Sequence, residues 1–313
     1  MRRTRMRTVG ARALVAAAVL GAGVLGAGTS QGAGGTRPAA VVEQAAEGAL
    51  QADDNCDLAA SLPPAKNVGA KIRKIRERGS LVVGVDQNSF NWGFRDPQSG
   101  RIEGFDIDLA RAIAKSVLGD PNKVTLKALP TARRIDAIKA GEVDMVVRTM
   151  TITCDRKKEI SFSVPYFRTS QQLAVPGSST AKSFTEALRG KRVCAAENSS
   201  THLELKRDSR GASEIRTTDN QLDCLVLMQL GEVDATFTDS ALAASQLAQD
   251  RTMRLIPETV LPSYMGIGMN QADTDLVAWV NQVVAEWRAD GGWRASYDHW
   301  LASTMGSPDG YLP

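Results

Sequence analysis

The tetrapeptide Gly-Glu-Val-Asp occupies residues 141–144 and recurs at residues 231–234, 90 positions later. Each copy follows a run of apolar residues at helical spacing and precedes a short apolar run that is typical of a strand. Glycine suits the left-handed position that ends a helix, so each copy marks a junction between a helix and a strand. Because the structural setting recurs together with the four residues, the sequence predicts two similar lobes.

Outward from the first copy, segments that favour strands alternate with segments that favour helices. Residues 81–85, Leu-Val-Val-Gly-Val, are typical of a strand buried on both faces. From residue 105 onward apolar residues recur at helical spacing, and residues 124–126 predict a further strand. A second landmark, residues 79–83, has a counterpart at residues 190–194. This alternation predicts an α/β fold.

The N-terminal residues are typical of an exported protein. Residues 1–33 contain five arginines and no acid, and they include an uncharged apolar run of 16 residues from Ala13 to Gly28. This pattern predicts a signal peptide, removed on export. Residues 34–69, rich in Ala, Gly and Gln, predict a flexible tether. No lipid-anchoring cysteine follows the apolar run closely, and we expect an extracellular or cell-surface location.

The charge of the chain argues against a nucleic-acid partner. The 38 basic and 35 acidic residues give a net charge of +3. Without the five arginines of the predicted signal, 33 basic residues remain against 35 acidic ones, which is a net charge near −2. The remaining chain therefore gives no argument for binding nucleic acid or an anionic membrane surface.

Common enzyme motifs are absent downstream of the predicted signal. Residues 34–313 contain no G-x-S-x-G elbow, Walker A loop, H-E-x-x-H helix or G-x-G-x-x-G turn. His202 and His299 are the only histidines, which leaves little for acid–base catalysis or a metal site. Trp293, Tyr297 and Trp300 form an aromatic stripe at helical spacing that we expect to pack on a lobe rather than hold a cofactor. We therefore expect a protein without catalytic activity, metal or cofactor.

Polar residues suited to holding an amino acid follow the predicted strands. Residues 148–156 follow the strand of the first repeat and offer hydroxyl and guanidinium groups for a carboxylate. Residues 198–201, Asn-Ser-Ser-Thr, form a hydroxyl-rich turn that serves equally as an anion site or a helix cap. Asp239, after the second repeat, can accept an ammonium group or cap the next helix. Since ligands bind at strand ends in open α/β sheets, these groups predict a free amino acid as ligand.

The same residues resemble the extracellular solute-binding proteins of family 3, which serve ABC importers of polar amino acids. The resemblance covers about residues 70–303 and is carried by several stretches: Gly104–Ala114, Gly141–Asp144, Met150–Thr153 with Arg156, Phe162–Tyr166, Gly231–Asp239 and Gly292–Leu301. Within the family the sequence most resembles the actinobacterial glutamate-type subgroup, which also has a cysteine at the position of Cys154.

The resemblance implies a type II fold like that of periplasmic binding proteins, with two similar α/β lobes joined by a two-strand hinge. The implied divisions are residues 70–167 plus 264–305 for lobe 1, residues 168–263 for lobe 2, and residues 306–313 for a C-terminal tail. The ligand would lie in the cleft between the lobes, which would close around it.

The resemblance also implies roles for single residues in binding the ligand's α-carboxylate and α-ammonium groups. Arg156 and Thr151, together with the backbone N–H of Thr149, would bind the α-carboxylate. Asp239 would accept the α-ammonium group.

The remaining implied residues would complete the site. Ser199 and Ser200 would add donors from lobe 2, where Asn198 replaces a glycine common in the family. Asp86, at the end of the first strand, would contact the ligand side chain. Some binders of acidic amino acids have a basic residue at the position of Asp86. Since Asp86 is acidic, Arg148 is the candidate for the positive charge that would contact an acidic ligand side chain. The alternative role of Arg148 is packing between elements.

All four cysteines follow the predicted signal, and an even number in an exported chain predicts two disulfides with three possible pairings. In the implied fold, Cys194 lies in the first strand of lobe 2 and Cys224 precedes the helix that leads to the second repeat. The matching segments of lobe 1 would lie side by side, so we expect a Cys194–Cys224 bridge. The remaining pair, Cys56–Cys154, would then fasten the tether to the loop from Thr149 to Arg156, which we call the ligand loop.

The expected function is the extracytoplasmic substrate-binding component of an ABC importer. We expect a monomer that binds glutamate or a related polar amino acid (aspartate, asparagine, glutamine) and delivers it to a membrane permease. One alternative is an extracellular amino-acid sensor that signals to a membrane partner. Another is a small-molecule lyase or hydrolase on the same fold; an additional acid near Arg156 would favour it, and the loop there contributes only Asp155.

Overall fold

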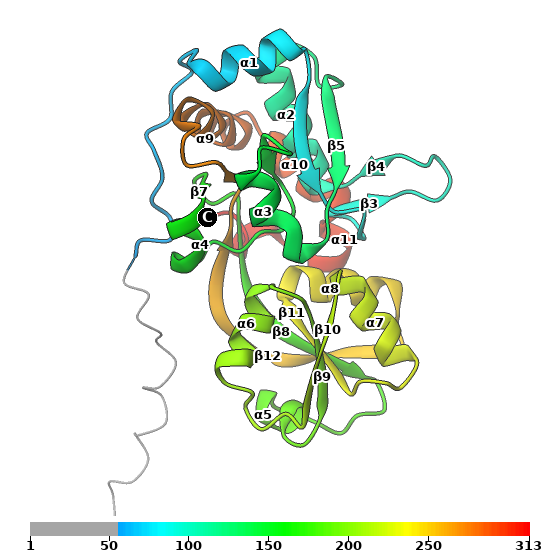
Figure 1. Ribbon diagram of the computed structural model, residues 1–313. Helices are drawn as coiled ribbons and strands as arrows, with labels where there is room; N and C mark the ends of the chain where they lie inside the picture. The colour runs from blue at the N-terminus through cyan, green and yellow to red at the C-terminus, as the bar shows by residue number, and fades with distance from the viewer. Residues whose placement is uncertain (1–55) are drawn as a thin grey trace, which may run out of the picture. The chain divides into compact units, whose positions relative to one another are not determined.

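The computed structural model describes residues 56–313, which form two α/β lobes, each built around a five-stranded sheet (Figure 1). The predicted signal and residues 34–55 of the predicted tether lie outside the described residues. Within the described part, no helix combines the length and the apolar character needed to cross a membrane. The prediction of two similar α/β lobes is confirmed.

Lobe 1 contains a mixed sheet with the strand order β5-β1-β6-β13-β7 and a small sheet with the order β2-β3-β4. Its strands are β1 Leu81–Val85, β2 Asn88–Ser89, β3 Gly93–Arg95, β4 Ile102–Glu103, β5 Val124–Ala128, β6 Met145–Val146, β7 Ser161–Phe162 and β13 Gly268–Met269. Its helices are α1 Ala70–Arg78, α2 Phe105–Leu118, α3 Arg134–Lys139, α4 Cys154–Glu159, α9 Thr274–Ala289, α10 Gly292–Trp300 and α11 Ala302–Met305, with 3-10 turns at Thr131–Arg133 and Pro308–Gly310.

Lobe 2 contains a mixed sheet with the strand order β10-β9-β11-β8-β12. Its strands are β8 Phe167–Pro176, β9 Arg192–Ala196, β10 Glu214–Thr218, β11 Ala235–Asp239 and β12 Met253–Met265. Its helices are α5 Phe184–Leu188, α6 Ser200–Arg207, α7 Gln221–Gln229 and α8 Ser240–Gln249.

The repeated tetrapeptide has the same structural role in both lobes. The glycine of each copy follows α3 or α7 with a positive φ, 68° in the first copy and 70° in the second. The aspartate of each copy then bonds to the first strand of its lobe. The Asp144 N–H donates to the Val82 oxygen and the Asp144 carboxylate accepts from the Val82 N–H, both at 2.8 Å. Asp234 makes the same two bonds with Arg192, at 2.8 and 2.9 Å. The predicted recurrence of structural setting is therefore confirmed.

The chain passes between the two sheets on β8 and β12, which pair antiparallel from Phe167 opposite Met265 to Pro176 opposite Met253. The register shifts twice along this pair, and the second shift includes Leu261, whose φ is 51°. A bulge of this kind lets a strand bend where it leaves a sheet. β8 and β12 form the two-strand hinge, and we keep 167/168 and 263/264 as the proposed lobe boundaries.

The core of lobe 1 contains the apolar faces expected from the sequence. Helix α2 buries the residues found at helical spacing: Ile107, Ala110, Ile113 and Ala114. The aromatic stripe packs in the same core, with the Trp293 ring 5.8 Å from that of Phe105. Tyr311, in the C-terminal tail, stacks on Phe167 at 5.4 Å. The C-terminal aromatic residues thus hold the chain end against lobe 1.

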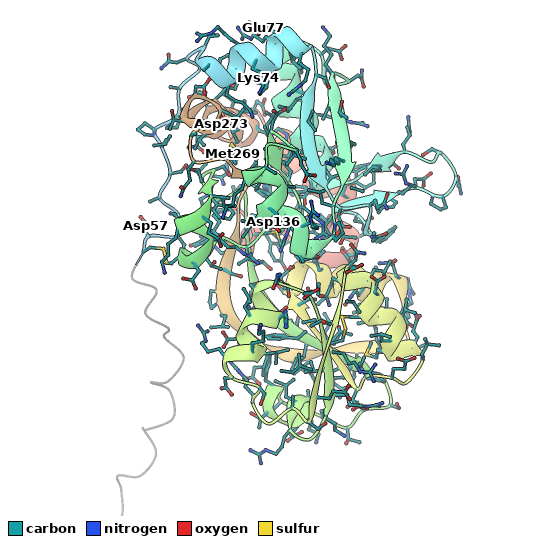
Figure 2. All side chains as sticks on the ribbon, in the orientation of Figure 1. Asp57, Lys74, Glu77, Asp136, Met269 and Asp273 are labelled. Carbon is teal, nitrogen blue, oxygen red and sulfur yellow. A yellow bond between two sulfur atoms is a disulfide. The ribbon has the colours of Figure 1, made fainter. Side chains whose placement is uncertain are left out.

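Residues 56–69 lie along lobe 1 without regular structure, and we call them the N-terminal strap. Cys56 forms a disulfide with Cys154, with 5.8 Å between their Cα atoms. Lys157 Nζ donates to the Asp57 oxygen at 2.7 Å, and Figure 2 shows Asp57 beside α4. The predicted flexible tether therefore ends in a segment with fixed contacts. The Cys56–Cys154 bond was expected, whereas the other contacts of the strap were not, because the strap has no apolar periodicity.

A second disulfide, Cys194–Cys224, joins β9 to α7 within lobe 2, with 5.5 Å between the Cα atoms. No free cysteine is present among residues 56–313. The two bridges join the pairs that the sequence led us to expect.

Candidate functional site

A polar cavity of about 30 Å³ lies where the two lobes meet. The residues that line it stand at strand ends and helix starts of both lobes: Asp86, Thr131, Arg134, Arg148, Thr149, Thr151, Ala196, Ser199, Ser200, Thr201, Gln221, Thr238, Asp239 and Leu242. The structure brings seven of the eight predicted ligand residues to this cavity, and the eighth, Arg156, lies beside it. A cavity of this size holds roughly one or two water molecules. Binding of an amino acid therefore requires the lobes to open or the side chains to rearrange.

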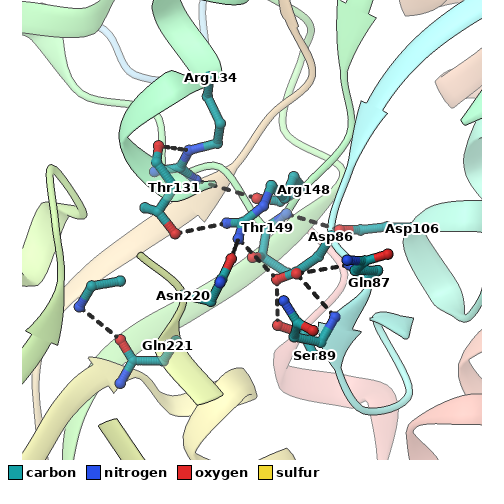
Figure 3. A network of polar contacts seen from close by, with 12 residues as sticks. Asp86, Gln87, Ser89, Asp106, Thr131, Arg134, Arg148, Thr149, Asn220 and Gln221 are labelled. Carbon is teal, nitrogen blue, oxygen red and sulfur yellow. Dashed lines mark hydrogen bonds and ion pairs between the residues drawn. The ribbon is translucent and has the colours of Figure 1, made fainter. Parts of the chain in front are cut away.

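Arg148 forms a buried ion pair with Asp86 (Figure 3). Its Nη2 lies 3.2 Å from Asp86 Oδ2, and its Nη1 donates to Thr131 Oγ1 at 2.9 Å. The Asp86 carboxylate also accepts from the Gln87 N–H and from Ser89 Oγ. The cation that the sequence assigned to the ligand side chain therefore already has a carboxylate partner within lobe 1.

Arg134 is a buried cavity residue that the sequence analysis missed. Its Nε donates to the backbone carbonyl oxygen of Thr131 at 2.9 Å, and its Nη1 donates to the backbone carbonyl oxygen of Arg148 at 3.3 Å. Among residues 56–313, no carboxylate lies within ion-pair distance of it. Burial and the neighbouring charges of Arg156 and Arg148 hold its pKa well below the ordinary value. A charged residue at the start of a helix is usually expected to be exposed to solvent, so the sequence offered little reason to place Arg134 in a buried site. The one feature that could have indicated it is its position shortly after a predicted strand.

Arg156 connects the two lobes. Its Nη1 donates to the backbone carbonyl oxygen of Thr151 at 2.8 Å, and its Nη2 donates to the backbone carbonyl oxygen of Asn198, in lobe 2, at 2.9 Å. Asn198 has a φ of 54°, a conformation that asparagine tolerates better than most residues, which fits its place at a position where glycine is common. Burial lowers the pKa of Arg156 to about 10, and no described residue provides it with a carboxylate.

The predicted role of the Thr149 backbone N–H needs correction. This N–H donates to Asp106 Oδ2 at 2.8 Å, so it is not free for the α-carboxylate of a ligand. Thr149 has a φ of 40°, and its N–H points to α2. Asp106 lies in the first turn of α2, and its side chain reaches the ligand loop. The Thr151 hydroxyl remains at the cavity, 3.1 Å from Ser200 Oγ of lobe 2.

Two predicted residues of lobe 2 cap helices and also line the cavity. Ser199 Oγ accepts from the His202 N–H at 3.0 Å at the start of α6. Asp239 Oδ1 accepts from the Leu242 N–H at 2.8 Å at the start of α8. Burial raises the pKa of Asp239 to about 6. A cationic group in the cavity would offset this cost of burying the Asp239 charge.

Two buried donors at the cavity have no hydrogen-bond acceptor among the described residues, namely Arg148 Nε and Gln221 Nε2. The Gln221 side-chain oxygen is occupied, since it accepts from the Ala196 N–H at 3.2 Å. Buried donors without partners are uncommon, and oxygen atoms of a ligand would satisfy them. The part of the chain that the structure describes has no cluster of His, Cys, Asp and Glu able to hold a metal ion. The chemistry suits a small ligand rich in oxygen acceptors.

Asp155 does not supply the additional acid near Arg156 that an enzyme would need. Its carboxylate lies 2.6 Å from Lys158 Nζ, and its side chain is 79% exposed. The acid in the ligand loop therefore faces solvent rather than the cavity.

Two α/β lobes, two crossing strands and a polar cavity at their junction define a two-lobed binding protein of the type II periplasmic kind. Residues 81–303 match the model of the bacterial extracellular solute-binding proteins, family 3. The chain belongs to this family, and the resemblance found in the sequence is confirmed.

Relatives of the chain are named for different amino acids. The glutamine-binding protein of Geobacillus stearothermophilus is 36% identical over 197 residues, which cover 63% of this chain and 75% of that protein. The glutamate-binding protein GluB of Corynebacterium efficiens is 25% identical over 240 residues, covering 74% of this chain and 80% of that protein. The solved structure of an ancestral arginine-binding protein bound to glutamine matches with a TM-score of 0.67 at 32% identity, covering 74% of this chain and 99% of that one.

Proposed function

We propose that this protein is the substrate-binding component of an ABC amino-acid importer and that it binds an acidic amino acid, L-glutamate or L-aspartate. The observation that carries the proposal is the charge of the buried groups at the cavity. Arg134 and Arg156 have no carboxylate partner among residues 56–313, and Asp239 lines the same cavity. Two unpaired cations and one anion are complementary to a ligand with two carboxylates and one ammonium group.

The cost of burying charge favours a dicarboxylic ligand. An unpaired buried ion carries a penalty of several kcal/mol, which an opposite charge with good hydrogen bonds offsets. The α-carboxylate of any amino acid compensates one guanidinium, and only an acidic side chain compensates the second. Arg148 does not change this count, because Asp86 neutralises it at 3.2 Å. Glutamine, which two of the compared proteins are named for or hold, would meet the second guanidinium with a dipole alone.

The family resemblance assigns an orientation to the ligand. Arg156 and Thr151 would bind the α-carboxylate, and Asp239 the α-ammonium group. Arg134, at the start of α3, would then contact the side-chain carboxylate in place of Arg148. Ser199 and Ser200, at the start of α6, would add hydroxyl donors from lobe 2.

Calorimetric titration with L-glutamate, L-aspartate and L-glutamine tests the acidic ligand. We expect the unmodified protein to bind glutamate or aspartate more tightly than glutamine. Arg134→Gln should weaken glutamate binding by on the order of 30-fold, since a charge-assisted bond contributes about 1.5–3 kcal/mol, and glutamine binding by much less. Arg148→Gln should also weaken glutamate binding more than glutamine binding, because it leaves Asp86 unpaired at the cavity.

The matched control is the double variant Asp86→Asn/Arg148→Gln, which removes the ion pair as a unit. We expect it to keep the preference for glutamate that Arg134→Gln loses. Tighter binding of glutamine than of either acid by the unmodified protein would contradict the acidic ligand, although not amino-acid binding itself.

The affinity should depend on pH through Asp239. Only the ionised carboxylate attracts the ligand ammonium group, and burial raises the pKa of Asp239 to about 6. Protonation as the pH falls through 6 therefore removes the attraction. Between pH 7.5 and pH 5 we expect the dissociation constant for L-glutamate to rise roughly tenfold. At one pH unit below its pKa, Asp239 is about one-tenth ionised, and the affinity falls in proportion. Asp239→Asn should bind more weakly at pH 7.5 and lose this dependence. A retained pH dependence in that variant would assign it to another group.

A further inference from the structure

Asp106 is a buried carboxylate outside the set of residues that line the cavity, and its side chain is only 1% exposed. It lies in the first turn of α2 and points toward the ligand loop. Its Oδ2 accepts from the Thr149 N–H at 2.8 Å, and its Oδ1 accepts from the Tyr166 hydroxyl, also at 2.8 Å. Figure 3 shows the bond between Asp106 and Thr149 next to Arg148. Asp106 thus connects α2 to the loop that carries Arg148 and Thr151.

The bond to Asp106 holds an unfavourable backbone conformation. Thr149 has a φ of 40°, and a β-branched residue rarely adopts a positive φ. Such conformations persist where the surrounding structure fixes them, and they cluster at binding sites. The hydrogen bond from the Thr149 N–H to a buried carboxylate supplies that restraint.

The same peptide unit reaches Arg134. The peptide bond between Arg148 and Thr149 is a planar unit whose C=O and N–H point in opposite directions in the trans form. Its N–H donates to Asp106, and its C=O, that of Arg148, accepts from Arg134 Nη1 at 3.3 Å. Fixing one end of this unit therefore fixes the other.

We propose that Asp106 is a positioning residue of the ligand site: by accepting from the Thr149 N–H it orients the Arg148–Thr149 peptide, and through the Arg148 carbonyl it orients the Arg134 guanidinium. The effect on ligand binding rests on the proposed function, in which Arg134 contacts the ligand side chain. The effect on the peptide itself does not.

The surroundings of Asp106 fit a group that holds this bond in both protonation states. Burial and the nearby Asp86 carboxylate raise the pKa of Asp106 to about 7, against the opposing effects of Tyr166, the Thr149 N–H and Arg148. When protonated, the carboxyl group still accepts from the Thr149 N–H on its carbonyl oxygen, and its O–H can donate to the Tyr166 hydroxyl. The restraint on the peptide therefore requires an oxygen acceptor, not a charge.

This distinction defines the variants to compare. Asp106→Asn keeps an oxygen for the Thr149 N–H and offers an N–H to the Tyr166 hydroxyl, whereas Asp106→Ala removes the acceptor. The matched control is Asp108→Asn, because Asp108 lies in the same helix but accepts from Ser296 Oγ at 2.9 Å and Trp300 Nε1 at 2.7 Å, away from the loop. By calorimetry with L-glutamate we expect Asp106→Ala to weaken binding more than tenfold, Asp106→Asn less than threefold and Asp108→Asn less than twofold.

Nuclear magnetic resonance of the Thr149 amide provides a readout that needs no ligand. We expect its signal to show a transition near pH 7 from Asp106 in the unmodified protein and in Asp108→Asn, and this transition to be absent in Asp106→Asn, where only the shift due to Asp239 near pH 6 should remain. Its hydrogen exchange should be at least tenfold faster in Asp106→Ala than in the unmodified protein, measured where both are folded.

The two measurements separate the hypotheses. Faster exchange with unchanged affinity in Asp106→Ala would reduce Asp106 to a local structural role and overturn the proposal, and so would unchanged exchange. If the unmodified protein binds neither L-glutamate nor L-aspartate, the proposed function fails, and the exchange rate of the Thr149 amide alone decides whether Asp106 fixes the peptide.

Discussion

Replacing Arg156 with alanine should weaken L-glutamate binding by on the order of 100-fold or more, while the fold remains intact. A charge-assisted hydrogen bond contributes about 1.5–3 kcal/mol, and Arg156 would offer two to the α-carboxylate. Leaving that carboxylate without a cation in a buried site adds to the loss. A 100-fold change corresponds to about 2.7 kcal/mol, within the range of these contributions.

Like Arg148, whose Nη2 donates to Asn220 Oδ1 of lobe 2 at 3.2 Å, Arg156 also spans the lobes. Its Nη2 donates to the Asn198 oxygen of lobe 2 at 2.9 Å, so alanine removes a lobe–lobe contact along with the ligand contact. The matched control is Arg294→Ala, since Arg294 forms an ion pair with Asp298 on α10 and is 60% exposed. Calorimetry should find the control within twofold of the unmodified protein. A loss of tenfold or less for Arg156→Ala would remove Arg156 from the ligand site.

The fold followed from the sequence because its determinants are local and occur twice. The helix spacing from residue 105 and the apolar run at 81–85 gave α2 and β1. The repeated tetrapeptide gave the lobe symmetry, and in the structure Asp144 and Asp234 bond to the first strand of their lobes in the same way. Apart from the expected Cys56–Cys154 bridge, the contacts of residues 56–69 could not be predicted in this way, since an extended strap held by single contacts has no periodicity.

The sequence predicted where the ligand site lies, but not which charged side chains pair with one another there. Asp86, Arg148 and Asp239 lie at or just after strand ends of the two sheets and line one cavity, as the usual position of ligands at strand ends and the family resemblance led us to expect. Which carboxylate neutralises which guanidinium depends on distances of a few ångströms between elements distant in sequence. The sequence therefore left Arg148 between a role toward the ligand side chain and a packing role, whereas in the structure it pairs with Asp86. It missed Arg134, which has no described carboxylate within ion-pair distance.

The Cys56–Cys154 bridge should contribute more to stability than the Cys194–Cys224 bridge. It joins residues 98 positions apart, and the loop-entropy model assigns about 4.7 kcal/mol to a closure of this length. The Cys194–Cys224 bridge spans 30 positions, for which the same model gives about 3.6 kcal/mol. Chemical denaturation of Cys56→Ser/Cys154→Ser should therefore show a loss of about 4 kcal/mol, roughly 1 kcal/mol more than Cys194→Ser/Cys224→Ser.

Ligand affinity should separate the two bridges more sharply than stability does. Cys154 is the first residue of α4, the helix that carries Arg156, and Lys157 of the same helix donates to the Asp57 oxygen of the strap. Without the bridge the strap is no longer covalently bound to α4, so Arg156 is less well ordered in the free protein. Ordering Arg156 when the ligand binds then costs free energy, which reduces the affinity. We expect Cys56→Ser/Cys154→Ser to bind L-glutamate several-fold more weakly, and Cys194→Ser/Cys224→Ser to bind it within twofold of the unmodified protein. Equal affinities in both variants, measured where both are folded, would limit the Cys56–Cys154 bridge to stability, because the bridge reaches the ligand only through Arg156.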